Sequence, residues 1–174
     1  MLKRRKVIQS AAALAAAGLG LSALARGSDS PLPPVGSMLP LPVVTLLDGR
    51  IWTPDKVAGK VLVVYWWASW CPFCVLQSPH IEALWRAQRV RGLEVLALSI
   101  DKEAAAAGNY MKAKGYSFPA GMLRPEVARV LPKPDGLPVV VVLKVSRKGR
   151  DGKVVFAEAG EMFPEDVEGL KKFL

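Results

Sequence analysis

The sequence predicts an α/β fold in which a central mixed sheet is flanked by helices and preceded by an N-terminal β-hairpin extension. Two apolar runs, 61–65 and 93–100, are continuous enough to be buried strands, and a helical segment at 75–91 separates them. Strands joined by a helix in this way pair in parallel. Residues 137–145 then hold five valines, and a turn returns the chain through 153–158 as an antiparallel hairpin.

Residues 1–25 are expected to be an export signal. The basic run Lys3-Arg4-Arg5-Lys6 precedes an alanine-rich apolar stretch that ends in the small-x-small site Ala23-Leu24-Ala25. The pair Arg4-Arg5 is similar to the twin-arginine export signal. A general secretory signal and an uncleaved membrane anchor are the alternatives. Each of the three places the rest of the chain in the periplasm, with membrane contact only through this segment if it is not cleaved.

The chain after the signal is expected to begin as a linker. Residues 26–42 are rich in proline, glycine and serine, which is typical of an extended segment. The remainder, 43–174, is long enough for one domain with a single core. We therefore place the domain boundary near residue 42.

The elements of this domain follow from hydrophobic periodicity and from capping residues. Asp48-Gly49 between two short apolar runs is a hairpin signal. Thr53-Pro54-Asp55 supplies an N-cap, a first-turn proline and a first-turn acid for a short helix. In chain order, the expected elements are strands at 43–47 and 51–52, a helix at 53–59, a strand at 60–67, a helix at 75–91, a strand at 93–100, a helix at 102–114, a short strand or turn at 118–122, a helix at 125–131, strands at 137–145 and 153–158, and a closing helix at 164–174.

The only two cysteines lie in one pentapeptide, Trp70-Cys71-Pro72-Phe73-Cys74, between the expected strand at 60–67 and its helix. One helical turn separates the sulfurs, so a disulfide can form or break with little backbone movement. A Cys-x-x-Cys at such a turn is typical of a redox-active pair, because the helix N-terminus stabilises the first thiolate. A zinc half-site is the alternative. Zinc takes four ligands, and the chain has no third cysteine and one histidine, His80.

The dipeptide between the cysteines suggests an oxidant. We expect the sulfur of Cys71 to accept hydrogen bonds from the amides of Phe73 and Cys74, because proline at position 72 removes neither donor. Stabilising the thiolate of the reduced pair makes the disulfide a better oxidant. Trp70 abuts Cys71 and is expected to cover the disulfide, while Phe73 helps to grip a partner.

The order of elements, with Trp-Cys-x-x-Cys after the first core strand, resembles the thioredoxin fold over the whole mature chain. Several segments match one branch of that superfamily: Gly59-Lys60 before the strand, Trp67-Ala68-Ser69-Trp70 before the cysteines, Pro79 in the helix, and Gly136-Leu137-Pro138 before the late strand. With the hairpin and the export signal, they narrow the resemblance to TlpA-type extracytoplasmic thiol–disulfide oxidoreductases. These include the reductases that serve cytochrome c maturation.

The resemblance implies a redox-active disulfide between the catalytic residues Cys71 and Cys74. Cys71 would attack a partner disulfide and Cys74 would resolve the mixed disulfide. It also implies a cis peptide bond before Pro138, with the backbone of Leu137 pairing with a bound polypeptide. The implied partners are protein dithiols or disulfides and a membrane or periplasmic electron donor, with no cofactor and no metal. The expected substrate-binding residues are Trp70, Pro72, Phe73, Leu137 and Pro138.

Three positions depart from the family pattern. The buried acid that thioredoxins carry near the redox pair would align with Tyr65, which titrates too high to replace it. TlpA-type reductases often place a glutamate three residues after the second cysteine, where this chain has Gln77, an amide that cannot take a proton. After Pro138 the family usually has Thr-Thr, and this chain has Val139-Val140. We therefore expect a more apolar substrate groove, and we expect water or another acid to handle the proton of Cys74.

Composition disfavours nucleic-acid binding and leaves one non-enzymatic alternative. The net charge is +9, but four of the basic residues belong to the N-terminal run, and the rest form no basic cluster interleaved with aromatics. The alternative is a Cu(I) carrier on the same fold, with Cys71, Cys74 and a methionine as soft ligands. Such carriers generally space their cysteines differently and add a histidine.

Overall fold

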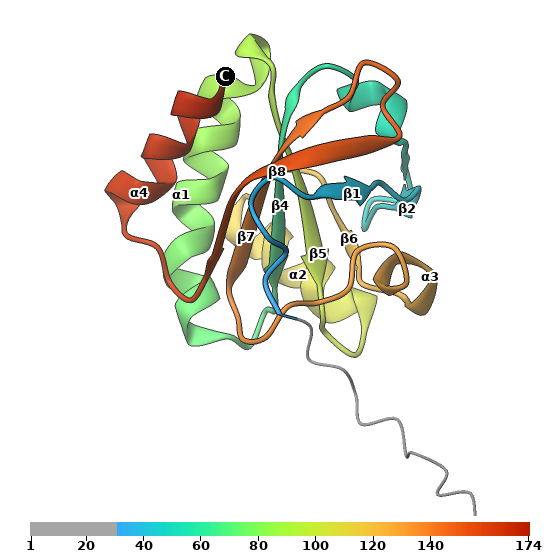
Figure 1. The fold of residues 1–174 in the computed structure, drawn as a ribbon. Coiled ribbons are helices and arrows are strands. Elements are labelled where there is room, and N and C mark those ends of the chain that lie inside the picture. Colours follow the sequence, from blue (N-terminus) through green and yellow to red (C-terminus); the bar gives the residue numbers. More distant parts are fainter. Residues whose placement is uncertain (1–30) are drawn as a thin grey trace, which may run out of the picture.

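The computed structural model describes residues 31–174, which form a six-stranded mixed sheet with helices on both faces (Figure 1). The expected export signal at 1–25 lies outside the described residues. Across the sheet, the strands are β1 (Met38–Pro40), β8 (Asp151–Ala159), β7 (Val139–Val145), β4 (Val61–Trp67), β5 (Leu93–Ser99) and β6 (Ala120–Met122). The central strand β4 pairs in parallel with β5 and antiparallel with β7, so the predicted mixed sheet is confirmed.

The other elements cover the two faces of this sheet. They are the hairpin strands β2 (Val44–Thr45) and β3 (Ile51–Trp52), the helices α1 (Pro72–Gln88), α2 (Ala104–Lys114), α3 (Pro125–Ala128) and α4 (Pro164–Gly169), and the 3₁₀ turns η1 (Pro54–Val57), η2 (Arg89–Arg91) and η3 (Leu170–Phe173). The expected hairpin turn is confirmed, because β2 pairs antiparallel with β3 and Gly49 takes the left-handed φ of 83° that its turn requires.

Alternate residues of β4 build two hydrophobic clusters. Every residue of β4 is buried, as expected for a central strand that both neighbours and both faces cover. Its odd-numbered side chains, such as Val63 and Tyr65, pack with α1, α2 and α4. Its even-numbered side chains, such as Leu62 and Trp66, pack with α3 and the β2–β3 hairpin. The cysteines belong to the first cluster, so the candidate site lies on the α1 face.

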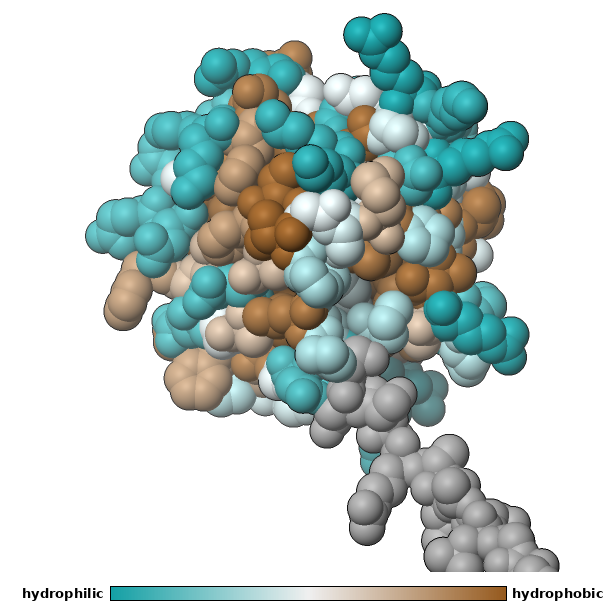
Figure 2. Space-filling view, viewed as in Figure 1, coloured by the Kyte–Doolittle hydropathy of each residue, from teal (hydrophilic) through white to brown (hydrophobic). Residues whose placement is uncertain are grey.

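Helix α1 lies beside α4 and begins just after β4 (Figure 1). Because only residues 68–71 separate the strand from the helix, the helix N-terminus is held at the carboxyl edge of the sheet. In the space-filling view from the same side, hydrophilic side chains crowd the periphery and hydrophobic ones gather toward the middle (Figure 2).

The sheet begins earlier in the chain than the sequence suggested. Met38–Pro40, inside the range 26–42 that we expected to be a linker, pairs with β8 as an edge strand. The prolines of this region led us to expect a linker. An edge strand tolerates the missing N–H of a proline because one side of the strand has no neighbour. The expected closing helix 164–174 is also divided, since α4 gives way to the 3₁₀ turn η3.

Candidate active site

Both cysteines lie at the N-terminus of α1, where the predicted turn places them. Cys71 is the N-cap residue, and its sulfur accepts a hydrogen bond from the Cys74 amide at 3.2 Å. Both are free thiols, and the exposed fractions are 4% for Cys71 and 1% for Cys74. The first sulfur therefore occupies the position in which unpaired amides of a helix stabilise negative charge.

The hydrogen bonding of Cys71 differs from our expectation in one respect. We expected the amides of both Phe73 and Cys74 to donate to its sulfur. Among the described residues, the Cys74 amide alone does so. The N-cap geometry brings the third amide after the cap into line with the sulfur, and the argument for an oxidising pair therefore loses one of its two donors.

Large apolar side chains stand exposed beside the buried cysteines. The exposed fractions are 65% for Trp70, 52% for Phe73 and 55% for Leu76. Phe73 and Leu76 are three residues apart on α1, so their side chains lie on the same side of the helix. Exposed apolar groups that gather at one place mark binding surfaces. Trp70 and Phe73 were expected here. Leu76 was missed because the sequence of the helix does not predict whether this leucine faces the core or the solvent.

The peptide bond between Leu137 and Pro138 is cis, as the resemblance implied. Because Val139 pairs with Trp66, this bond lies beside the end of β4, from which the chain continues to Cys71. The carbonyl of Pro138 accepts from the amide of Gly160 at 2.8 Å. No hydrogen bond among the described residues uses the backbone of Leu137, which leaves it open to a bound chain.

A buried carboxylate that we did not predict fastens the loop before Cys71. Asp101 accepts the Ser69 amide at 3.0 Å, the Ser69 hydroxyl at 2.6 Å and the Ser99 hydroxyl at 2.7 Å. Since β4 and β5 are parallel, their carboxyl ends meet at one edge, which brings Asp101 to the loop. Polar residues that directly follow neighbouring parallel strands are expected to meet at this edge. That expectation could have identified Asp101 from the sequence.

Behind Cys74 lies a pair of buried hydroxyls. The Tyr65 and Ser78 hydroxyl oxygens are 3.0 Å apart, and the Ser78 hydroxyl donates to the Cys74 carbonyl at 2.7 Å. Burial raises the pKa of the Cys74 thiol above its usual range, and hydrogen bonding to Cys71 raises it further, while the Tyr65 hydroxyl acts in the opposite sense. Burial also raises the pKa of Tyr65, so this phenol is neutral and cannot serve as a base.

The amide of Gln77 lies one helical turn after Cys74 and is fully buried. Its Oε1 accepts the Met162 amide at 2.8 Å, which links α1 to the loop before α4. Its Nε2 has no hydrogen-bond partner among the described residues. A buried donor without a partner carries a desolvation cost, so Gln77 lowers the stability of the fold at this position. A side chain without this donor would remove that cost.

The remaining aromatic and titratable candidates do not join the site. Trp66 and Trp67 are buried in opposite clusters, and Trp85 is buried on α1. His80 is half-buried on α1, one and a half turns past Cys74. Within residues 31–174, no group of three or more His, Cys, Asp or Glu side chains is arranged to hold a metal ion. No helix of the same range has both the length and the apolar character to cross a membrane.

Comparison with protein families matches residues 35–122, half of the chain, to the AhpC/TSA family. Among curated proteins, the thiol-disulfide oxidoreductase ResA of Bacillus thuringiensis (strain Al Hakam) is 28% identical over 138 residues, which cover 79% of this chain and 77% of that protein.

Two solved structures show the same architecture. A thiol:disulfide interchange protein of the thioredoxin family from Chlorobium tepidum TLS superimposes with a TM-score of 0.71 at 23% identity, over 81% of this chain and 97% of that one. StoA from Bacillus subtilis superimposes with a TM-score of 0.61 at 17% identity, over 80% of this chain and 99% of that one. The predicted thioredoxin-like fold is confirmed.

Proposed function

This chain belongs to the AhpC/TSA family and is a thiol–disulfide oxidoreductase, and on that premise we propose that it is exported and exchanges disulfides with partner proteins through Cys71 and Cys74. The observation that carries the proposal is the helix-cap position of Cys71, whose sulfur accepts the Cys74 amide at 3.2 Å. This position favours a thiolate nucleophile, and the second sulfur lies within reach of the first.

The exchange runs in two steps. The Cys71 thiolate attacks a partner disulfide, so that a mixed disulfide forms and one partner sulfur leaves as a thiol. The Cys74 sulfur then attacks Cys71, which forms the intramolecular disulfide and releases the second partner sulfur as a thiol. The partner gains the two electrons that the pair loses. A membrane or periplasmic electron donor then reduces the intramolecular disulfide and resets the pair for another round. In reverse, the same steps oxidise a partner dithiol and leave the pair reduced.

The partner polypeptide docks beside the pair. Trp70, Pro72 and Phe73 offer exposed apolar contact, and the unpaired backbone of Leu137 before Pro138 offers hydrogen bonds to an extended chain. The buried Val139 and Val140 continue the apolar character behind this contact. We therefore expect partners that present an apolar segment next to their cysteine.

Export and domain organisation complete the proposal. Residues 1–25 act as the export signal, the linker follows, and the thioredoxin-like domain works in the periplasm. Disulfide chemistry persists outside the cytoplasm, where thiols are not kept reduced by the glutathione pool. Cytochrome c maturation is the process that the TlpA-type resemblance suggests.

Turnover of a disulfide-linked peptide tests the proposal. With dithiothreitol as reductant, the wild-type domain should accelerate reduction, Cys71→Ser should abolish the acceleration, and Cys74→Ser should accumulate a mixed disulfide that mass spectrometry detects. His80→Ala on the same helix is the control and should turn over normally. Wild-type turnover no faster than that of Cys71→Ser would reject the oxidoreductase assignment.

Copper titration distinguishes the proposed oxidoreductase from the alternative function, a Cu(I) carrier on the same fold. A Cu(I) carrier would bind one equivalent tightly enough to compete with a chelator and would lose it in either cysteine variant. We expect no such binding at the affinity of a dedicated carrier.

A further inference from the structure

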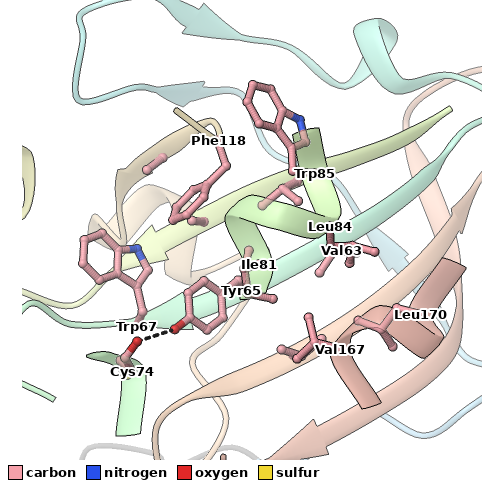
Figure 3. Close-up of a cluster of buried hydrophobic side chains, with 14 of the residues drawn as sticks. Val63, Tyr65, Trp67, Cys74, Ile81, Leu84, Trp85, Phe118, Val167 and Leu170 are labelled. Carbon is pink, nitrogen blue, oxygen red and sulfur yellow. Dashed lines mark hydrogen bonds between the residues drawn. The ribbon is translucent and has the colours of Figure 1, made fainter. Parts of the chain in front are cut away.

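The loop between β4 and α1 is anchored in the hydrophobic core at both ends. Trp67, the last residue of β4, and Cys74, in the first turn of α1, both pack into the buried cluster that Figure 3 shows. The Trp67 carbonyl also accepts the amide of Ile100, which follows β5, at 3.0 Å. The part of the loop that the core does not fix is its middle, Ser69 and Trp70.

Cys71, which ends this loop, is held mainly by α1. Its amide donates to the Ala68 carbonyl at 3.2 Å, and its carbonyl accepts the Val75 amide at 3.1 Å. Its sulfur accepts the Cys74 amide at 3.2 Å. Two of these three hydrogen bonds belong to the first turn of the helix. The position of the nucleophile is therefore set by the helix rather than by the middle of the loop.

Trp70 has no comparable restraint of its own. Within residues 31–174, its backbone and its indole make no hydrogen bond, and its ring contacts no other aromatic ring. Its side chain is 65% exposed. The place of Trp70 is therefore set by its neighbours in the chain, Ser69 before it and Cys71 after it.

Ser69 is held by the carboxylate of Asp101, which is 7% exposed. Asp101 accepts the Ser69 amide at 3.0 Å and the Ser69 hydroxyl at 2.6 Å. In the part of the chain that the structure describes, no cation pairs with Asp101, so its charge is met by these donors and by the Ser99 hydroxyl at 2.7 Å. Hydrogen bonds to an ionised group are about twice as strong as neutral ones. Ser69 is thus the fixed point from which Trp70 projects.

We propose that Asp101 is a positioning residue that presents Trp70 to the partner polypeptide. The inference rests on the proposed function and names what prepares its docking surface. By holding Ser69, Asp101 keeps the Trp70 ring in place beside Cys71 before a partner arrives. A ring that is already ordered binds without the entropy cost of immobilising it on contact. Asp101 therefore acts on partner binding and not on the reactivity of the nucleophile.

Steady-state kinetics with a disulfide-linked peptide that carries an apolar segment beside its cysteine test the proposal, with dithiothreitol as reductant. We expect Asp101→Ala to raise KM by about tenfold and to change kcat by less than about twofold, because uniform binding is lost. Alkylation of Cys71 by iodoacetamide should keep its wild-type rate. Glu103→Ala, at an exposed acid that makes no side-chain cap hydrogen bond, is the matched control and should behave as the wild type.

A double-mutant cycle shows whether the effect passes through Trp70. Trp70→Ala removes the ring that Asp101 is proposed to present. In that background, Asp101→Ala should raise KM by less than about twofold, since residues that act through one another are not additive. A merely structural role of Asp101 would raise KM by the same factor in both backgrounds.

The outcomes are distinct. A wild-type KM in Asp101→Ala, or an equal rise of KM in both backgrounds, overturns the inference. Wild-type turnover no faster than that of Cys71→Ser rejects the proposed function instead. If Asp101→Ala also loses alkylation at Cys71, its active site is not native, and Ser69→Ala decides. This variant keeps the carboxylate and removes only the hydroxyl donor, so KM alone should rise by about threefold. An unchanged KM there rejects the positioning role.

Discussion

Cys71 and Cys74 are three residues apart and yet have different chemistry, because one caps the helix and the other lies inside it. The cap position supplies Cys71 with an amide donor, whereas burial in the core disfavours the charge on Cys74. The nucleophile and the resolving thiol are thus assigned by position alone. Cys74 must lose its proton when it resolves the mixed disulfide, and burial makes the resulting negative charge unfavourable.

This burial predicts a pH-dependent stability. Since the pKa of Cys74 is raised in the folded protein, its contribution to stability is fully present below its unfolded value of 9.0 and is lost as the pH rises beyond it. The oxidised protein has no thiol to titrate. Urea midpoints of the reduced protein should therefore fall relative to those of the oxidised protein above a pH of about 9. Parallel curves for the two forms would contradict the burial of Cys74.

Gln77 predicts a gain of function. In Gln77→Glu, an oxygen replaces the partnerless Nε2, while the other oxygen can still accept the Met162 amide. The carboxylate would add a proton acceptor one turn from Cys74, so we expect faster turnover at neutral pH. Gln88→Glu, at the far end of α1, is the matched control. Equal turnover of wild type and Gln77→Glu would mean that proton removal does not limit the reaction.

At the scale of elements, the loop from β4 to α1 is bound by Asp101, which follows β5, in addition to its own backbone hydrogen bond from the Cys71 amide to the Ala68 carbonyl. Asp101→Ala removes the acceptor of three hydrogen bonds and leaves buried donors unpaired. We expect a loss of about 3 kcal/mol in the free energy of unfolding. Chemical denaturation measures this loss, and Asp135→Ala, at an exposed acid, should cost far less. An Asp101→Ala protein as stable as the control would show that the network does not hold the loop.

The start of α1 also predicts the effect of the dipeptide. Changing Pro72-Phe73 to Gly-Pro would remove the Phe73 amide, but that amide makes no hydrogen bond to Cys71 in the structure. We therefore expect the reduction potential to shift by less than about 30 mV, the equivalent of a tenfold change in the equilibrium constant. Equilibration with glutathione buffers gives the value. A larger downward shift would restore the two-donor interpretation that the sequence favoured.

At the scale of the molecule, the sequence predicted whatever depends on local pattern. The buried strands at β4, β5 and β7 and the redox turn follow from apolar runs and from one pentapeptide. What it missed depends on contacts between distant segments. Met38–Pro40 becomes a strand only because β8 offers an edge, and Asp101 joins the site only because β5 is parallel to β4.

The same distinction holds around the pair. Tyr65 was singled out as a missing acid, but its partner Ser78 could be found only once β4 and α1 were packed together. Leu76 has no distinguishing neighbours in the sequence, and its exposure emerges from the orientation of α1. Residues whose role follows from their own chemical type, such as the two cysteines, could be predicted from the sequence. Residues whose role depends on a contact with a distant segment could not.

The central claim is that Cys71 and Cys74 cycle together between dithiol and disulfide. Equilibrium titration in glutathione buffers, followed by tryptophan emission and by mass spectrometry of trapped thiols, tests it most directly. We predict one two-electron transition in which both cysteines change state together, between about −120 and −270 mV, the range of disulfide-exchange proteins. Two thiols that remain free across that whole range, or a mixed disulfide with glutathione that never resolves, would contradict the account.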